Sequence, residues 1–453
     1  LSTKYPNISF STDIKAEFKG KNIEDLNGEA HIYNFTMNEQ NEIYNLDTIS
    51  FSAYSNKQYK QYILDSEFLF AELEGKFNFE QILANGKKMI GKHIPSLIQS
   101  PRLKENLPNE ATLFIEITDT KPFEKILGIP IKLDKTAYMS GYFNSEQSEM
   151  DLNLSVPHLI YDTRSFGDIS IIGSNTNDSL TCKIDAKNYT NNHPIDINIL
   201  LKGLNDNIQT SVAWDNNSDN KYCGNISINT SFYKIDKTIP ESRIQILPTD
   251  IVINDTIWNI YESNITLNPN KININNLKLG NRDKHIIIDG KVSDQIEDSI
   301  KINLKEIDLE YVFDIINFHP VDFAGYATGN AYIANIKASP ELQANLKVRS
   351  FTFNKAHLGN MNLLGGWSKE KNTIHLNAHI TDYKNNSTTN VNGEVRLGAP
   401  PKGGLDLMIR TNNIDLYFLN KYTSGIFTNL NGRASGWTRV FGPFKGINLE
   451  GDM

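Results

Sequence analysis

The stretch GYATGNAYIANIKASPELQANLKV, residues 325–348, reads as two short strands joined by a turn before Pro340. Small or apolar residues alternate with polar ones through it, as expected of strands whose successive side chains point to opposite faces of a sheet. A similar stretch, GRASGWTRVFGPFKGINLEGDM, closes the chain at residues 432–453. The sequence therefore predicts β-hairpins that recur along the chain.

The same alternation dominates most of the chain. In HPIDINIL, Ile195, Ile197 and Ile199 fall on one side of a predicted strand and the polar residues fall on the other. Turn-forming clusters such as NNSDN at 216–220 and GAPPKGG at 398–404 separate such strands. We expect an all-β fold built from many short antiparallel strands.

Only a few segments have helical periodicity. The strongest is EQILANGKKMIGKHIPSLI, which predicts an amphipathic helix over about 80–98. Shorter candidates lie at 121–128, 307–318 and 414–422. These helices are too short to cover a whole sheet of this length.

An internal repeat is visible in the C-terminal half. Ile307, Asp308 and Leu309 recur 107 residues further along as IDL at 414–416, and the G-x-A-x-G of 325–329 recurs at 432–436. Repeats of this kind stack as quasi-linear arrays. We divide the chain into modules at 1–118, ending soon after the predicted helix, then 119–305, 306–412, and 413–453 as the start of a further repeat.

Composition excludes several classes of protein. The chain has 453 residues with a net charge of −8, and its 45 Lys and Arg residues are dispersed, so no basic stripe suits nucleic acid. Its two cysteines lack metal-site spacing. No run approaches the roughly 18 to 20 apolar residues of a membrane-spanning helix. The absence of an initial methionine favours an internal segment of a longer protein.

The apolar face of such a sheet needs a cover. Fully burying one Val, Leu, Ile or Phe side chain stabilises a fold by about 1.5 to 3 kcal/mol, so dozens of them left in water would unfold the sheet. Three architectures satisfy this requirement: a closed barrel, a sandwich of two sheets, or one curled sheet that holds an apolar ligand.

Several stretches carry a resemblance to a known family. The two hairpins quoted above, AELEGKFNFEQIL…HIPSL at 71–97, SVAWDNNSDNKYCGNISINTSF at 211–232 and LPTDIVINDTIWNIYESNITL at 247–267 together resemble the TamB proteins of the AsmA-like superfamily, in the form carried by Bacteroidota. The resemblance covers essentially the whole chain as an internal piece of a longer protein. It implies an elongated, repetitive antiparallel sheet curled into a taco-shaped apolar groove, with a few short helices.

The resemblance also implies a function and a location. It implies a periplasmic protein, anchored to the inner membrane by a segment outside this chain, that conducts phospholipids between inner and outer membrane and supports outer-membrane biogenesis. Its partners would be phospholipid acyl chains and an outer-membrane barrel protein of the TamA type. The predicted groove-lining residues are the inward apolar positions Ile272, Ile274, Ile286, Ile288, Ile374, Leu376, Ile380, Leu405, Leu407 and Ile409.

Motifs of catalysis and cofactor binding are absent from the sequence. No GxSxG, HExxH, P-loop or GxGxxG occurs. His375 and His379 would lie about 13 Å apart on a strand, too far for one metal ion. We therefore expect no enzyme activity, no metal and no cofactor. Two alternatives stay open: a structural or adhesive β-repeat stalk with a closed core, and a scaffold that offers strand edges to barrel proteins during assembly.

Overall fold

The computed structural model describes residues 8–39, 42–99, 107–162, 164–175, 179–189, 194–235, 239–295, 297–310, 322–370, 372–397, 403–420, 431–444 and 446–452. Strands account for 71% of the structure and helices for 7%, and the 29 strands are antiparallel members of one sheet. The prediction of an all-β, repetitive antiparallel fold with a few short helices is confirmed.

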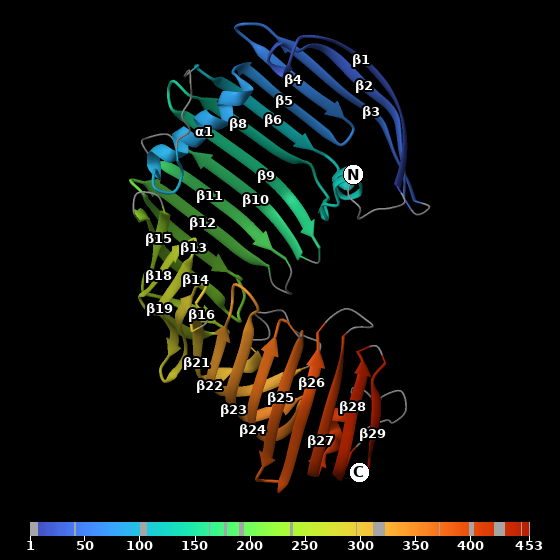
Figure 1. Ribbon diagram of the computed structural model, residues 1–453, viewed down its shortest axis with the longest axis vertical. Coiled ribbons are helices and arrows are strands. Elements are labelled where there is room, and N and C mark those ends of the chain that lie inside the picture. The colour runs from blue at the N-terminus through green and yellow to red at the C-terminus, as the bar shows by residue number, and fades with distance from the viewer. Residues whose placement is uncertain are drawn as a thin grey trace. The chain divides into compact units, whose positions relative to one another are not determined.

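The chain divides into two compact units, which are described one at a time. Unit 1 comprises residues Leu1–Ser242 and Thr249–Thr256, and unit 2 comprises Arg243–Pro248 and Ile257–Met453. The division falls inside the module predicted at 119–305. Figure 1 shows unit 1 in blue to green and unit 2 in yellow to red.

In unit 1, each strand pairs mainly with its neighbours in the sequence. The strands are β1 (Ile8–Lys19), β2 (Asn27–Glu39), β3 (Glu42–Ser55), β4 (Lys60–Ser66), β5 (Leu69–Lys76), β6 (Glu110–Ile117), β7 (Ile131–Leu133), β8 (Ala137–Asn144), β9 (Glu149–Tyr161), β10 (Arg164–Ser174), β11 (Leu180–Asn188), β12 (Ile195–Leu204), β13 (Asn207–Asp215), β14 (Tyr222–Ile235) and β16 (Thr249–Ile253). Strand β6 pairs with β8, so the short β7 lies beside the far end of β9. Strand β16 pairs with β14.

Unit 2 continues the same meander. Its strands are β17 (Thr256–Ile260), β18 (Ser263–Asn268), β19 (Lys271–Asn281), β20 (Lys284–Val292), β21 (Ser299–Asp308), β22 (Phe323–Ala334), β23 (Glu341–Phe353), β24 (Ala356–Ser368), β25 (Thr373–Asp382), β26 (Ser387–Arg396), β27 (Gly404–Asp415), β28 (Arg433–Pro443) and β29 (Asn448–Asp452). Strand β15 (Ile239–Ile246) crosses the boundary between the units. Because most strands pair with the next one along the chain, strand register decides which apolar side chains become cross-strand neighbours.

The 107-residue repeat has a counterpart in the backbone. Glu306 and Asn413 occupy equivalent positions and both have left-handed backbone, with φ of 51° and 63°. Each sits at a register shift, between β21 and β22 or between β27 and β28. The extra residue of such a bulge bends the strand and increases its twist. The repeated sequence therefore places a bend at the same point of both strands.

Hydrogen bonds at these bends repeat as well. The Glu306 amide donates to Thr328 Oγ1, and 107 residues further on the Asn413 amide donates to Ser435 Oγ. Asp308 likewise accepts from the backbone two residues beyond it, and Asp415 does the same for Tyr417. Side chains thus satisfy amides that the bulge removes from the ladder.

Helices are few among the described residues, and only α1 is longer than two turns. Helix α1 spans Phe79–His93 rather than 80–98. It ends before Pro95 because a proline disfavours helical backbone in the residue before it, and Ile94 has φ −134°. Three short turns are η1 (Ile23–Asp25), η2 (Phe123–Leu127) and η3 (Leu416–Leu419). Of the helix predicted at 307–318, the first two residues belong to β21, and residues 311–318 lie outside the described part.

Candidate functional site

A continuous row of apolar side chains crosses unit 1 perpendicular to its strands. Each member is the cross-strand partner of the next, so all of them point to the same face. Its residues, which we call the unit 1 band, are Ala30, Phe51, Leu64, Ala71, Ile115, Met139, Leu154, Ile171, Ile184, Ile199, Val212 and Ile226. Every one of these side chains is half-buried. The band is therefore apolar, unbroken and partly open to solvent.

Protein covers the same face near one set of strand ends. There Ala53, Tyr62, Phe77 and Ala111 form a buried cluster, and Ile82 of α1 packs against it. Figure 1 shows α1 running across successive strands of unit 1. The helix thus shields one side of the band.

The opposite strand ends are also shielded. Ala137 of β8 is 5% exposed and Val156 of β9 is 8% exposed. The turn η2 lies nearby, because the ring of its Phe123 packs edge-on against Phe68 at 5.6 Å between centroids. Between the two shielded margins, Met139 and Leu154 stay half-buried. Unit 1 therefore has covered sides and a more exposed middle along its apolar face.

Polar contacts fix both ends of α1. At its start the Phe79 amide donates to Glu24 Oε1 at 2.7 Å, and Glu24 also pairs with Lys60. At its end Asp206, in the turn between β12 and β13, accepts from both the amide and the hydroxyl of Ser96 at 2.7 and 2.9 Å. The helix is held by turns that join strands far apart in the sheet.

In unit 2 the predicted lining residues all lie on one face. Ile272, Ile274, Ile286 and Ile288 belong to β19 and β20, and the bulge at Asn276 keeps the register aligned. The others belong to β25 and β27, which β26 joins: Ile374, Leu376, Ile380, Leu405, Leu407 and Ile409. Nine of the ten are half-buried, whereas Ile380 is 5% exposed.

Small residues connect these two groups across the unit. The register runs through a row, which we call the unit 2 band: Ile288, Ile302, Ala331, Ala344, Gly365, Leu376, Gly393 and Leu407. The Ala and Gly members were not predicted, because they give no apolar alternation signal. A second row through Ile307, Ala327, Val348 and Met361 is buried and ends at Ile380.

None of the predicted lining residues belongs to the unit 1 band, although the alternation of apolar and polar residues in its strands is visible in the sequence. The stretch containing Ile195, Ile197 and Ile199 showed the pattern, and Ile199 is a band member. What the sequence lacked was the register that joins each strand to the next.

Other sequence candidates lie apart from both bands. His375 and His379 point to the opposite face of β25, where His375 Nδ1 lies 3.2 Å from Glu394 Oε1 and His379 contacts Asn390. Among the described residues no group of three or more His, Cys, Asp or Glu is placed to hold a metal ion. Cys182 and Cys223 are both free thiols.

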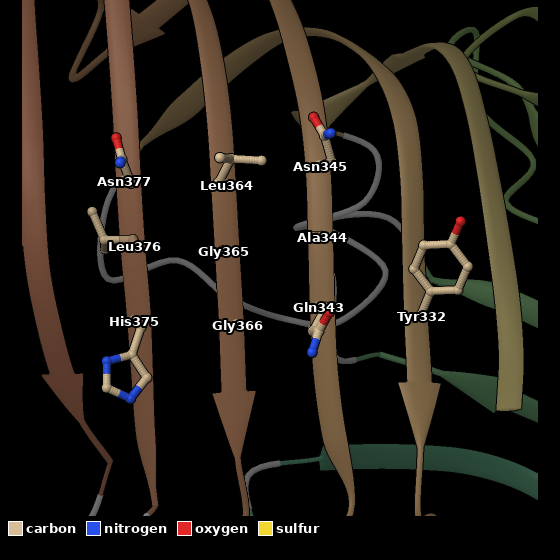
Figure 2. Close-up of a pocket in the computed structure, with 10 residues that line it drawn as sticks. All are labelled: Tyr332, Gln343, Ala344, Asn345, Leu364, Gly365, Gly366, His375, Leu376 and Asn377. Atoms are coloured by element: carbon tan, nitrogen blue, oxygen red, sulfur yellow. The ribbon is translucent and has the colours of Figure 1, made fainter. Parts of the chain in front are cut away.

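A shallow depression of ≈ 570 Å³ lies on the polar face of unit 2. Figure 2 shows that Gly365 and Gly366 of β24 leave a gap between the side chains of neighbouring strands. Tyr332, Gln343 and His375 stand around it. These three side chains are on the face opposite the unit 2 band, although the band members Ala344, Gly365 and Leu376 also line the depression.

Comparisons with family models, curated proteins and solved structures found no match to this chain. Within the described part of the chain, no helix has the length and apolar character needed to span a membrane.

Proposed function

We propose that this chain is part of a non-enzymatic lipid-transfer protein of the TamB type, in which phospholipid acyl chains lie on the apolar bands. The observation that carries the proposal is the unit 1 band, where each strand from β2 to β6 and from β8 to β14 contributes one half-buried apolar side chain. Each CH₂ group of an acyl chain moved from water onto such a surface contributes about 0.8 kcal/mol when fully buried.

Because neighbouring positions of the unit 1 band are alike, an acyl chain on the band is expected to slide along it rather than to stay at one position. Neighbouring positions such as Ile184, Ile199 and Val212 offer similar apolar surfaces at strand spacings of about 4.8 Å. A chain shifted by one strand would find nearly the same contacts, so it would meet no deep energy minimum. We infer that the headgroup stays in water at the open middle of the face, while the shielded margins hold the lipid laterally.

The cellular setting is part of the same proposal. A protein of this type would lie in the periplasm, held to the inner membrane by a segment outside this chain. It would pass phospholipids toward the outer membrane with a barrel partner of the TamA type. The half-buried bands support the contact with lipid. The location, the membrane anchor and the barrel partner rest on the resemblance to TamB proteins.

Extraction of the purified chain tests the proposal. Solvent extracts analysed by mass spectrometry should contain phospholipids in amounts that scale with protein. A variant with Ile199→Arg and Ile184→Arg should carry several-fold less, whereas the opposite-face variant Leu200→Arg should carry the wild-type amount. Lipid-free wild-type protein that also fails to take up phospholipid from vesicles would refute the proposal.

A closed structural stalk is the second candidate, and buried clusters favour it locally. Ala327, Val348, Phe351 and Met361 form a core in unit 2 that needs no ligand. If the same packing extended over the bands, no lipid would be extracted, and arginine at Ile199 would unfold the unit.

A further inference from the structure

The depression on the polar face of unit 2 is a hollow that the backbone does not require. It lies over β22 to β25, where Gly366 takes the place of a side chain between its cross-strand partners Gln343 and His375 (Figure 2). A Cβ atom at Gly366 would have its nearest contact at 3.5 Å, an ordinary van der Waals distance, and the glycine does not have left-handed backbone. A side chain would therefore fit there, yet the position holds glycine, which weakens a strand and often marks the close approach of a ligand.

Polar side chains with unused hydrogen-bonding capacity surround this gap. Gln343, Asn345 and Asn377 are exposed, and their side chains make no hydrogen bond to another residue in the described part of the chain. Further along the same face, by contrast, Asn303 donates to Asn330 Oδ1 at 2.8 Å. Each free amide offers two N–H donors and one carbonyl acceptor. The depression can therefore both donate hydrogen bonds to a ligand and accept them from it.

Two apolar side chains stand among these amides. Tyr332 is 44% exposed, and Leu364, the cross-strand partner of both asparagines, is 54% exposed. An exposed aromatic ring presents a flat face that can pack against the C–H groups of a ligand. Three strand spacings, about 14 Å, separate Tyr332 from His375 along the register. The site is therefore wide enough for more than one six-membered ring.

The charge and the backbone of the site narrow the class of ligand. None of the lining residues is Asp, Glu, Lys or Arg, and the carboxylate of Glu394 beside the site lies 3.2 Å from His375 Nδ1. The main-chain groups of β23, β24 and β25 are paired on both sides within the sheet, so a peptide cannot join them as a further strand. One ring and one leucine are too little apolar surface for an acyl chain. A neutral ligand that combines many hydroxyl groups with apolar C–H faces fits these observations.

We propose that this depression binds a neutral oligosaccharide. Sugar hydroxyls replace water at the three free amides, one pyranose ring stacks on Tyr332, and a neighbouring ring sits in the gap at Gly366. Tyr332, Gln343 and His375 are on the face opposite the unit 2 band, so this binding does not depend on lipid transfer. The same unit would then hold lipid on one face and a glycan on the other.

Saturation-transfer NMR titrations of the purified chain with cellohexaose, maltohexaose and chitohexaose test the proposal. We expect at least one of these probes to bind with a Kd of about 1 mM or tighter. The first two represent hexose chains and the third represents chains of N-acetylated amino sugars, so the preferred probe identifies the source of the ligand. Tyr332→Ala should weaken binding about tenfold or more, whereas Tyr332→Phe, which keeps the ring, should weaken it less than about threefold.

Two adjacent glycines supply a matched pair of variants. Gly366→Val fills the depression and should abolish binding. Gly365→Val places the same side chain on the opposite face, where a Cβ atom would have its nearest contact at 3.8 Å, and should bind as wild type. Tyr383→Ala removes a ring that is 82% exposed and does not line the depression, so it should also bind as wild type.

The outcomes bear on the glycan site alone. Failure of the folded wild-type chain to bind any of the three probes would overturn the proposal. Equal binding by wild type and Tyr332→Ala would overturn it as well, and this exposed substitution leaves the fold intact. Gly366→Val should leave the amount of extracted phospholipid unchanged, so a failure here is distinguishable from a failure of the lipid-transfer proposal.

Discussion

Arginine substitutions at two positions on the same face separate an open surface from a sealed core. Ile288 is half-buried between its cross-strand partners Leu277 and Ile302. Ile380 is 5% exposed and belongs to the buried cluster that contains Val348 and Met361. Both residues are isoleucines at central positions of unit 2. The difference between the losses of stability caused by the two substitutions therefore shows how fully protein covers each side chain.

The expected magnitudes differ several-fold. Ile288→Arg forfeits part of the roughly 1.5 to 3 kcal/mol for burying an isoleucine, and the long stem of arginine can lie along the band with its charge in water. We expect a loss of about 1 kcal/mol. Ile380→Arg would bury an unpaired charge and should cost about 4 kcal/mol or more.

Hydrogen exchange read by mass spectrometry measures both costs, because a stacked array need not unfold as a single unit. Peptides from β19–β21 should keep near-native protection in Ile288→Arg. Peptides from β24–β26 should lose protection in Ile380→Arg. Ile288→Arg should also reduce uptake of a fluorescent phospholipid, with Leu364→Arg on the opposite face as the control. Equal and severe loss of protection in both isoleucine variants would refute the idea that the unit 2 band is open.

Three further predictions concern the bend, the helix and one phenol. Asn413→Val should destabilise unit 2 by about 1 to 3 kcal/mol, because a β-branched residue resists left-handed backbone, whereas Asn413→Gly should be tolerated; chemical denaturation distinguishes them. Asp206→Ala should speed amide exchange at Ser96 and in the last turn of α1, whereas unchanged exchange would show that packing alone holds the helix. The hydrogen bond to Glu74 raises the pKa of Tyr59 to about 12, so its stabilising effect is complete below pH 10 and is lost as pH rises toward 12. Ultraviolet titration should show this delayed ionisation, and Tyr59→Phe should remove that part of the alkaline loss of stability.

Much of the fold was predictable because strand alternation is a local property. The alternation in 195–199 and in 374–380 predicted which side chains share a face, and the structure has these strands. The repeated IDL segments marked the bends at Glu306 and Asn413, although nothing in the sequence indicated their left-handed backbone. The end of α1 was set by Pro95, whose effect on the preceding residue the periodicity does not show.

Burial and register were not predictable from single strands. Ile374 and Ile380 have the same pattern in the sequence, yet Ile380 is buried and Ile374 is not, because Val348 and Met361 approach only one end of the strand. On β9, His158 lies 2.5 Å from Asp134 Oδ2 and 2.8 Å from Ser165 Oγ, and both contacts depend on the pairing of β9 with β7 and β10. Such a juxtaposition leaves no motif in the sequence.

Photo-crosslinking at neighbouring residues of β12 tests the central claim most directly. A benzophenone amino acid at Ile199 would lie on the unit 1 band, and one at Leu200, which is 52% exposed, would lie on the opposite face. After irradiation in cells, intact mass should show phospholipid adducts at position 199 and none at position 200. Adducts at 199 that consist only of protein, or lipid adducts of equal yield at both positions, would contradict the claim that acyl chains cover the band.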